Sequence, residues 1–364
     1  MNLTHQGSHR EHNLRVIFHS RPGVNGEPTA DNFKTEECPM PDAESLPRGF
    51  LMIKNLYISV DPALRCRMNE DTGVHYMKAY QLNTPVDGLG GVGEVMASAD
   101  PKIEVGDIVS ATFLWPWASY FTIESTNVRK LQKDLFSQHP SLALSLLGGT
   151  GLTAYLGMVE RGHVTREGQQ TVVVSSAAGA TGSVAGQVAR ILGAKRVVGI
   201  CGTEEKCCIL TRELGFDTAI NYKKDDVAAE LTKACPEGIH VYFDNVGGVL
   251  SEIVIDKMVQ NGHVILCGQI AMYNKDVPYP PPIEARLKEI LQERNITRER
   301  FLVLNHAEKF EQSLSVLAEW YAAGMIKVKE TVVEGLGNAP KAFASMMRGG
   351  NNNIGKLIIC VNQP

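Results

Sequence analysis

The sequence predicts an α/β protein in which a doubly wound parallel sheet is joined to a smaller, mostly β domain. Three observations predict this architecture. Apolar strand patterns and helix patterns alternate from Thr171 onward, as they do in parallel sheets covered by helices. A glycine-rich turn follows the first of these strands and opens a helix. Before residue 139, strand patterns and proline-containing loops dominate instead.

The small β domain is expected over residues 13–138, after a polar tail at 1–12 that we expect to be flexible. Residues 14–18 and 50–56 have strand patterns, with prolines in the loops between them. Residues 90–95 and 105–109 predict two strands joined by a turn. The glycines of the first segment also suggest a phosphate loop, but no helix pattern follows them, which favours tight turns in a small barrel.

The nucleotide-binding domain is expected over residues 139–319, beginning with helix patterns at 142–147 and 152–159. The strand Thr171–Ser175 then leads into a turn at 177–182, where Ala177 replaces the first glycine of the usual pattern. Such a turn brings backbone N–H groups to a pyrophosphate at the positive end of a helix dipole. The turn therefore predicts a dinucleotide site.

The elements after this turn are expected from their hydrophobic periods. We expect strands at 196–201, 218–221, 241–246, 263–268 and 300–304, with helices at 204–214, 227–234 and 250–258. A further helix places Phe310, Leu314, Leu317 and Tyr321 on one face. Strands at 331–333 and 357–361 flank a helix at 339–347, and we expect residues 320–364 to return to the first domain.

The end of the second strand predicts which dinucleotide binds. NAD-binding chains usually carry an acid about 20 residues after the glycine turn, where it holds the ribose 2′-hydroxyl. Here that position is Gly202, and Thr203 and Lys206 follow it. A hydroxyl and an ammonium group suit a 2′-phosphate, so the sequence predicts NADPH. Glu204 and Glu205 are the counter-evidence, although acids are also favoured in the first turn of a helix for structural reasons.

Substrate chemistry is expected at the carboxyl ends of the later strands, where ligands bind in open parallel sheets. Asn245 follows one strand and suits a cofactor ribose or phosphate. The segment 267–275 follows the next strand, and its Tyr273 is either a proton donor or a loop tyrosine bonded to backbone. Tyr222 is either a stacking partner for adenine or a surface tyrosine, and the prolines at 280–282 form either a lid or a connector.

Composition and charge argue against several classes of function. A net charge of −4 disfavours a nucleic-acid or anionic-membrane partner. The apolar runs are strand-sized and the first residues lack an apolar core, so we expect neither a membrane span nor a secretory signal. The eight cysteines are scattered without a Cys-x-x-Cys pair, which predicts a reduced, cytoplasmic protein with no zinc site. Both a monomer and a homodimer remain open.

Several strings of the sequence together resemble the zinc-independent medium-chain dehydrogenase/reductase family. They lie at residues 59–62, 65–69, 175–182, 198–203, 241–248 and 265–273, and the resemblance covers roughly residues 13–362. It implies a GroES-like β-barrel domain interrupted by a Rossmann domain. The strings at 274–282 and 293–303 are most similar to the branch of the family that reduces 15-oxo-prostaglandins.

The resemblance also implies roles for individual residues. The pyrophosphate would be held by Gly179, Ala180, Thr181 and Gly182, the 2′-phosphate by Lys206 and the adenosine end by Tyr222. The rest of the cofactor would be lined by Asn245, Cys267, Gly268, Gln269, Ile270, Ala271, Met272, Tyr273, Phe301, Leu302, Val303 and Asn353. Phe113 and Leu114 would contact the substrate, in a segment one residue longer than is usual.

Two departures from the family pattern bear on the substrate pocket. Ala63 stands where relatives usually carry tyrosine, which would enlarge the pocket. Asn351 and Asn352 are inserted just before Asn353.

The activity that the resemblance implies is conjugate reduction of the 13,14 double bond of 15-oxo-prostaglandins. NADPH would deliver a hydride to the β-carbon of the enone, and Tyr273 would donate a hydrogen bond to the carbonyl oxygen where negative charge develops. Two other functions stay open: a quinone or general alkenal reductase on the same fold, and a non-catalytic NADPH-binding regulatory protein.

Overall fold

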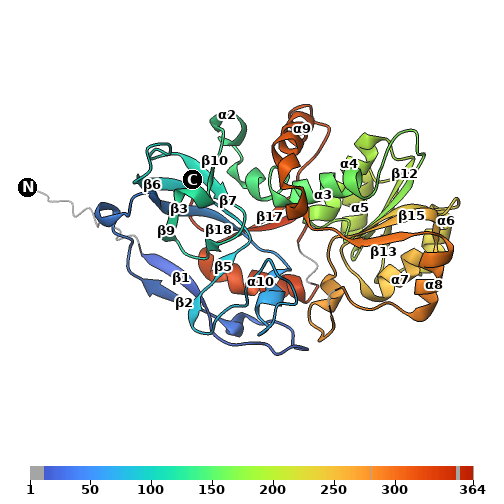
Figure 1. The fold of residues 1–364 in the computed structure, drawn as a ribbon, viewed down its shortest axis with the longest axis horizontal. Helices are drawn as coiled ribbons and strands as arrows, with labels where there is room; N and C mark the ends of the chain where they lie inside the picture. The colour runs from blue at the N-terminus through green and yellow to red at the C-terminus, as the bar shows by residue number, and fades with distance from the viewer. Residues whose placement is uncertain (1–11, 279, 350–352, 364) are drawn as a thin grey trace, which may run out of the picture.

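A computed structural model describes residues 12–278, 280–349 and 353–363, and in it a β-rich part lies beside an α/β part (Figure 1). The tail expected at 1–12 lies outside the described residues except for His12, and so do the inserted Asn351 and Asn352. In the described part of the chain, no helix is both long enough and apolar enough to cross a membrane.

The β-rich part is built around a sheet of seven strands in the described chain. Its order is β10-β7-β6-β3-β18-β17, and β9 also pairs with β3. The strands of this part are β1 (Asn13–Phe18), β2 (Phe33–Cys38), β3 (Phe50–Ser59), β4 (Thr84–Pro85), β5 (Asp87–Gly88), β6 (Gly91–Ser98), β7 (Ile108–Ala111), β8 (Trp115–Pro116), β9 (Tyr120–Glu124), β10 (Arg129–Lys130), β17 (Glu330–Glu334) and β18 (Lys356–Cys360). Its short helices are α1 (Leu64–Arg67) and α2 (Lys133–Phe136).

The helix α10 (Ala339–Met347) covers one end of this β-rich part. Its Phe343 is fully buried and meets Phe33 edge to face, with ring centroids 5.9 Å apart. Edge-to-face pairs of this kind add to the burial of both rings. The helix that precedes the last strand therefore packs on the strands that begin the chain.

The α/β part contains a parallel sheet of order β13-β12-β11-β14-β15-β16. Its strands are β11 (Thr171–Ser175), β12 (Arg196–Cys201), β13 (Thr218–Asn221), β14 (Ile239–Asp244), β15 (Met258–Leu266) and β16 (Thr297–Arg300). Its helices are α3 (Gly149–Glu160), α4 (Ala180–Leu192), α5 (Glu204–Arg212), α6 (Val227–Ala234), α7 (Gly248–Asp256), α8 (Ala285–Glu293) and α9 (Phe310–Ala322). The order reverses beside β11, which confirms the doubly wound sheet that the sequence predicts.

Several predicted elements have the bounds that the structure shows, and two others differ in kind or position. The predicted ranges of β12, β13, α6 and α10 are those observed. The strand predicted at 300–304 is wrong: β16 is Thr297–Arg300, and Val303–Lys309 is a 3-10 helix. β16 is a charged edge strand, so it lacks the continuous apolar pattern of a central strand, and its pairing ends where β15 ends, at Leu266 opposite Arg300. The helix predicted at 142–147 is likewise a 3-10 helix, Pro140–Leu144.

The last strand of the chain joins the sheet of the β-rich part. β18 runs antiparallel to β3, with Ile359 opposite Ile58, and parallel to β17. At the start of β18, Lys356 is buried, and its Nζ lies 2.5 Å from Asp61 Oδ1 and 3.3 Å from Val60 O. A buried ammonium group needs such partners, because burying an unpaired charge is costly. The ion pair therefore fixes where β18 enters the sheet.

We expect Lys356→Met to lower the free energy of unfolding by roughly 3 kcal/mol, because it leaves the Asp61 carboxylate without its cation. Urea denaturation followed by circular dichroism measures the change. The control is Lys195→Met, whose solvent-exposed pair with Glu237 should contribute almost nothing. Equal changes in the two variants would contradict the structural role of the buried pair.

Candidate active site

The glycine turn between β11 and α4 has the geometry of an anion site. Gly179 is the N-cap of α4 and provides no side chain, so the backbone N–H groups of the first helical turn remain for a ligand. A Cβ on Gly182 would lie 2.4 Å from Ser176 O and 2.9 Å from Ala177 Cα, so only glycine fits there. These features fit a dinucleotide pyrophosphate.

Ala177, which replaces the first glycine of the pattern, is accommodated by a glycine on the neighbouring strand. It is fully buried, and its N–H donates to Ile200 O over 3.0 Å. A Cβ added to Gly199 of β12 would come within 2.9 Å of the Ala177 methyl. The space that Gly199 leaves therefore allows alanine in the turn.

The segment that precedes β18 lies against this turn. Gly355 donates its N–H to Ala178 O over 2.8 Å and forms an isolated parallel bridge with Gly179. Gly355 has φ +70°, and a Cβ there would lie 1.8 Å from Lys329 O, so the crossing requires glycine. Asn353 is partly buried. The structure thus brings Gly355 from the end of the chain to the predicted pyrophosphate site, and Asn353 precedes it by two residues.

Glu204, one of the two acids that count against NADPH, is engaged at the end of β12. Glu204 Oε1 accepts a hydrogen bond from Asn221 Nδ2 over 3.0 Å and lies 3.3 Å from Lys224 Nζ. Its carboxylate is therefore engaged with β13 and the residues that follow it. Thr203 caps α5 by accepting a hydrogen bond from the Lys206 N–H over 3.2 Å, so its hydroxyl has a structural role as well.

Two lysines and a tyrosine gather beside Gly202. A Cβ on Gly202 would come within 3.1 Å of Tyr222 Cε1 and 3.4 Å of Lys223 Cε. Lys223 Nζ lies 5.9 Å from the centre of the Tyr222 ring. Burial lowers the pKa of Lys206, and the positive charge of Lys223 lowers it further. Two adjacent ammonium groups with an aromatic ring fit an adenosine that carries a 2′-phosphate.

The turn after β14 is held by a buried carboxylate. Asp244 accepts hydrogen bonds from Tyr242 Oη at 2.9 Å, from the Gly247 N–H at 2.9 Å and from Ser251 Oγ at 2.7 Å. Asn245 donates its side-chain Nδ2 to Ser175 O over 2.8 Å, so this amide nitrogen ties the end of β14 to the end of β11. Asn245 therefore lies next to the end of β11, and one of the two N–H groups of its amide is engaged there.

The segment after β15 runs from Cys267 through a 3-10 helix, Ile270–Met272, to Tyr273. The N–H groups of Cys267 and Gly268 both donate to Asp244 O, and Gln269 is buried. The Tyr273 hydroxyl oxygen accepts a hydrogen bond from the Gln269 N–H over 3.2 Å. Accepting this bond uses a lone pair of the oxygen and not its O–H group, so the arrangement is compatible with a proton donor.

Arg65 joins this segment to the β-rich part. This fully buried side chain donates from Nε to Asn274 Oδ1 over 3.0 Å and from Nη2 to Gly23 O and Gly26 O. Because Asn274 follows Tyr273 directly, the position of Tyr273 depends on this contact. Tyr273 lines a cavity of about 660 Å³ together with Arg21, Lys275 and Pro278.

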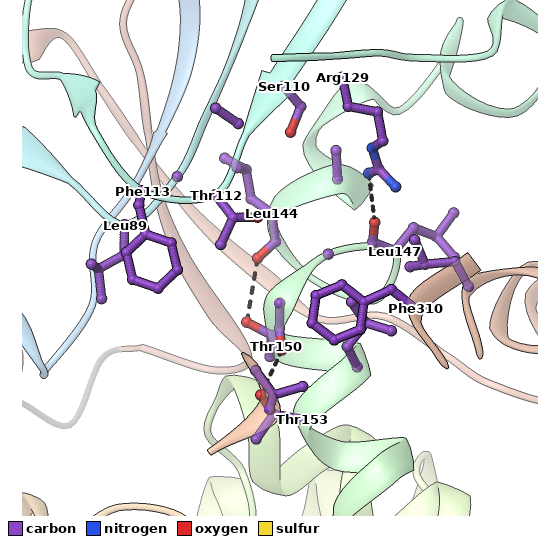
Figure 2. Close-up of a pocket in the computed structure, with 18 of the residues that line it drawn as sticks. Leu89, Ser110, Thr112, Phe113, Arg129, Leu144, Leu147, Thr150, Thr153 and Phe310 are labelled. Carbon is purple, nitrogen blue, oxygen red and sulfur yellow. Dashed lines mark hydrogen bonds between the residues drawn. The ribbon is translucent and has the colours of Figure 1, made fainter. Parts of the chain in front are cut away.

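A larger cavity of about 1010 Å³ is lined by six of the other predicted residues (Figure 2). Its lining includes Thr181, Cys267, Phe301, Leu302 and Val303 from the α/β part, and Ala63 and Phe113 from the β-rich part. Leu114, predicted with Phe113 to contact substrate, is 62% exposed and lies outside this lining, as does Tyr273. Phe113 and Leu114 both have positive φ, so the chain turns sharply there and sends the two side chains in different directions.

Tyr76 and Arg300 also line this cavity, and sequence reasoning missed both. The Arg300 guanidinium carbon lies 5.5 Å from the centre of the Tyr76 ring. Burial raises the pKa of Tyr76 and a hydrogen bond from Arg300 opposes that rise. No local signal in the sequence could have found this pair, because its members come from different parts of the fold.

The described residues contain no group of three or more His, Cys, Asp or Glu side chains that could hold a metal ion.

Comparisons with known proteins place the chain among reductases. A family model described as the N-terminal domain of oxidoreductase matches residues 15–131, and one described as zinc-binding dehydrogenase matches residues 180–319. The NADP-dependent oxidoreductase YfmJ of Bacillus subtilis is 38% identical, covering 93% of this chain and 95% of the relative. Prostaglandin reductase 1 of Rattus norvegicus is 35% identical, covering 92% and 95%. The crystal structure of CurA from Vibrio vulnificus in complex with NADPH has a TM-score of 0.86 at 32% identity, covering 96% and 100%.

The cluster at the end of β12 gives a direct test. We expect Lys206→Ala to raise the Kd for NADPH by about 10- to 100-fold, because a charge-assisted contact to the 2′-phosphate is lost, while the Kd for NADH stays nearly unchanged. Quenching of intrinsic fluorescence by each cofactor measures both constants. Lys233→Ala, on α6 and paired with Glu230, is the control. An equal rise in Kd for NADPH and NADH would mean that Lys206 does not bind the 2′-phosphate.

Proposed function

The chain belongs to the medium-chain dehydrogenase/reductase family, and we propose that it is an enone reductase whose cofactor is NADPH. More specifically, we propose the activity of prostaglandin reductase 2, the reduction of the 13,14 double bond of 15-oxo-prostaglandins. Two relatives that support the general reaction are named as NADP-dependent, and a third is a prostaglandin reductase.

One observation carries this proposal. A single cavity is lined by Thr181 beside the glycine turn, by Cys267 after β15 and by Ala63 of the β-rich part. The first two positions belong to the predicted cofactor site, and the third faces the same space from the other part of the molecule. Such a cavity allows a cofactor ring and a substrate to meet away from bulk water.

The proposed chemistry divides between the cofactor and the protein. When bound, NADPH would supply a hydride to the β-carbon of a carbon–carbon double bond conjugated to a carbonyl, and the resulting enolate would take up a proton from water at the α-carbon. The protein then has to orient the substrate and donate a hydrogen bond to the carbonyl oxygen, where negative charge develops. Tyr273 is our candidate donor, and Arg65 is the residue that positions its segment through Asn274. Tyr76 is a second candidate, because it lines the larger cavity and Arg300 bonds to it.

The size of the cavity supports a large substrate. Its volume of about 1010 Å³ lies at the upper end of the range for small-molecule sites, and Ala63 contributes only a methyl group to its wall. The quinone or alkenal reductase is the main alternative, and a tobacco 2-alkenal reductase is 34% identical over 86% of this chain. The remaining alternative function is that of a non-catalytic NADPH-binding regulatory protein.

We propose the cytoplasm as the location of the enzyme, because all eight cysteines are free in the structure. Even Cys201 and Cys207, whose sulfur atoms lie 3.4 Å apart, remain thiols.

The candidate donors can be separated by substitution. We expect Tyr273→Phe to lower kcat for an enone by about 10- to 1,000-fold, the range for losing one such donor, while Tyr76→Phe changes kcat much less. Stopped-flow measurement of NADPH oxidation gives both values. Tyr57→Phe makes the same chemical change in a half-buried tyrosine outside both cavities and is the control. The opposite pattern would transfer the role of donor to Tyr76.

The substrate class can be tested in one comparison. We expect 15-oxo-prostaglandin E to give a higher kcat/KM than a quinone or a short alkenal when NADPH oxidation is followed for all three. A quinone or the alkenal as best substrate would favour the alternative reductase. No turnover with any of the three would favour the non-catalytic protein.

A further inference from the structure

The larger cavity differs in character between its two sides (Figure 2). Phe113 and Leu89 lie on one side, Thr150 and Thr153 lie between, and Arg129, Leu147 and Phe310 lie on the other. The cavity lining includes the apolar side chains of Leu135, Phe136, Leu147, Phe310 and Leu314, together with polar neighbours of Arg129 in the chain, Thr126, Asn127, Lys130 and Gln132. We call these apolar side chains together with Arg129 the Arg129 arm.

Only one hydrogen bond to another residue is observed for the Arg129 side chain. Arg129 comes from β10, and its side chain points into the cavity, where Nη2 donates to Leu147 O over 3.1 Å. A guanidinium group carries five N–H donors in a planar fork. Most of this fork is therefore available to a ligand that enters the cavity.

The charge of Arg129 is also uncompensated. Among the described residues, no carboxylate lies within ion-pairing distance of its guanidinium, whereas the adjacent Lys130 has Asp107 at 2.6 Å. Arg129 is an exposed residue, and the partial burial of its guanidinium group lowers its pKa.

The lining of the cavity itself contains two carboxylates, those of Asp61 and Glu311. Asp61 is paired with Lys356, and Glu311 is exposed at the start of α9. Neither neutralises Arg129, so the arm combines apolar side chains with an unpaired cation.

We propose that the Arg129 arm binds the terminal carboxylate of a long-chain enone, with the alkyl chain along its apolar side chains. The proposal rests on the proposed enone reduction and specifies its substrate class as amphipathic acids. A carboxylate matches the planar fork of arginine in a two-point contact, and the alkyl chain gains by leaving water. Arg129 is thus a specificity-determining residue remote from the reacting double bond.

The test compares three substrates. Two of them differ only in the carboxylate, and the third lacks both the carboxylate and the long chain. They are 15-oxo-prostaglandin E, its methyl ester and a short enone without an acid group. We expect Arg129→Met to raise KM for the free acid by about 10- to 100-fold, as for a lost charge-assisted contact, with kcat nearly constant. KM for the ester and the short enone should stay the same, because methionine keeps the apolar contacts of the arginine stem.

Two further variants complete the experiment. Arg129→Lys retains the positive charge but not the planar fork of donors. Its KM for the free acid should therefore lie between those of wild type and Arg129→Met. Arg286→Met, a surface arginine paired with Asp256 on α7, should change nothing. Arg129→Lys also serves as the test if the methionine variant fails to fold, which circular dichroism would show.

The outcomes separate this inference from the proposed function. The carboxylate site is overturned if Arg129→Met raises KM equally for the acid and the ester. It is also overturned if the wild-type enzyme does not prefer the acid to its ester. In both cases enone reduction stands. If no enone is reduced, the proposed function fails. Binding of the free acid and of its ester to wild type and Arg129→Met, measured by calorimetry, then decides on the carboxylate site alone.

Discussion

The return of the chain at residues 353–360 is the constraint on which the rest of the structure depends. Gly355 donates to Ala178 O in the glycine turn, and the next residue, Lys356, forms a buried ion pair with Asp61. One short segment thus contacts the nucleotide-binding turn and begins the strand that pairs with β3. A side chain at Gly355 would collide with Lys329 O, and an uncharged residue at 356 would leave Asp61 without its cation. The site exists because both contacts form together.

The position of the cavity follows from this constraint. Its walls come from the β-rich part and from the ends of the parallel strands, so neither part encloses it alone. Arg65 adds a second connection, because it bonds to the loop that carries Tyr273. The two candidate donors, Tyr273 and Tyr76, lie in different loops and line different cavities. Their relative importance therefore depends on how closely the two parts approach each other around a bound substrate.

Much of the fold could be predicted from the sequence, and the limits have physical causes. β11 and β12 are buried on both faces, so their continuous apolar runs mark them clearly. β16 is an edge strand with charged residues, and its pattern does not distinguish it from a loop. The pair of Tyr76 and Arg300 was unpredictable for another reason: hydrogen bonds between distant segments leave no trace in local composition.

The sequence by itself determined the dinucleotide fold, the family and the absence of an acid at the end of β12, because glycine spacing and hydrophobic period act locally. Only the tertiary structure decided what surrounds these residues. It directs Glu204 toward Asn221 and Lys224, lets Ala177 fit because Gly199 leaves space, and places Arg129 in the cavity lining with no carboxylate partner among the described residues. Each of these depends on atoms that come together only when distant segments pack, because electrostatic and steric contacts act through space rather than along the chain.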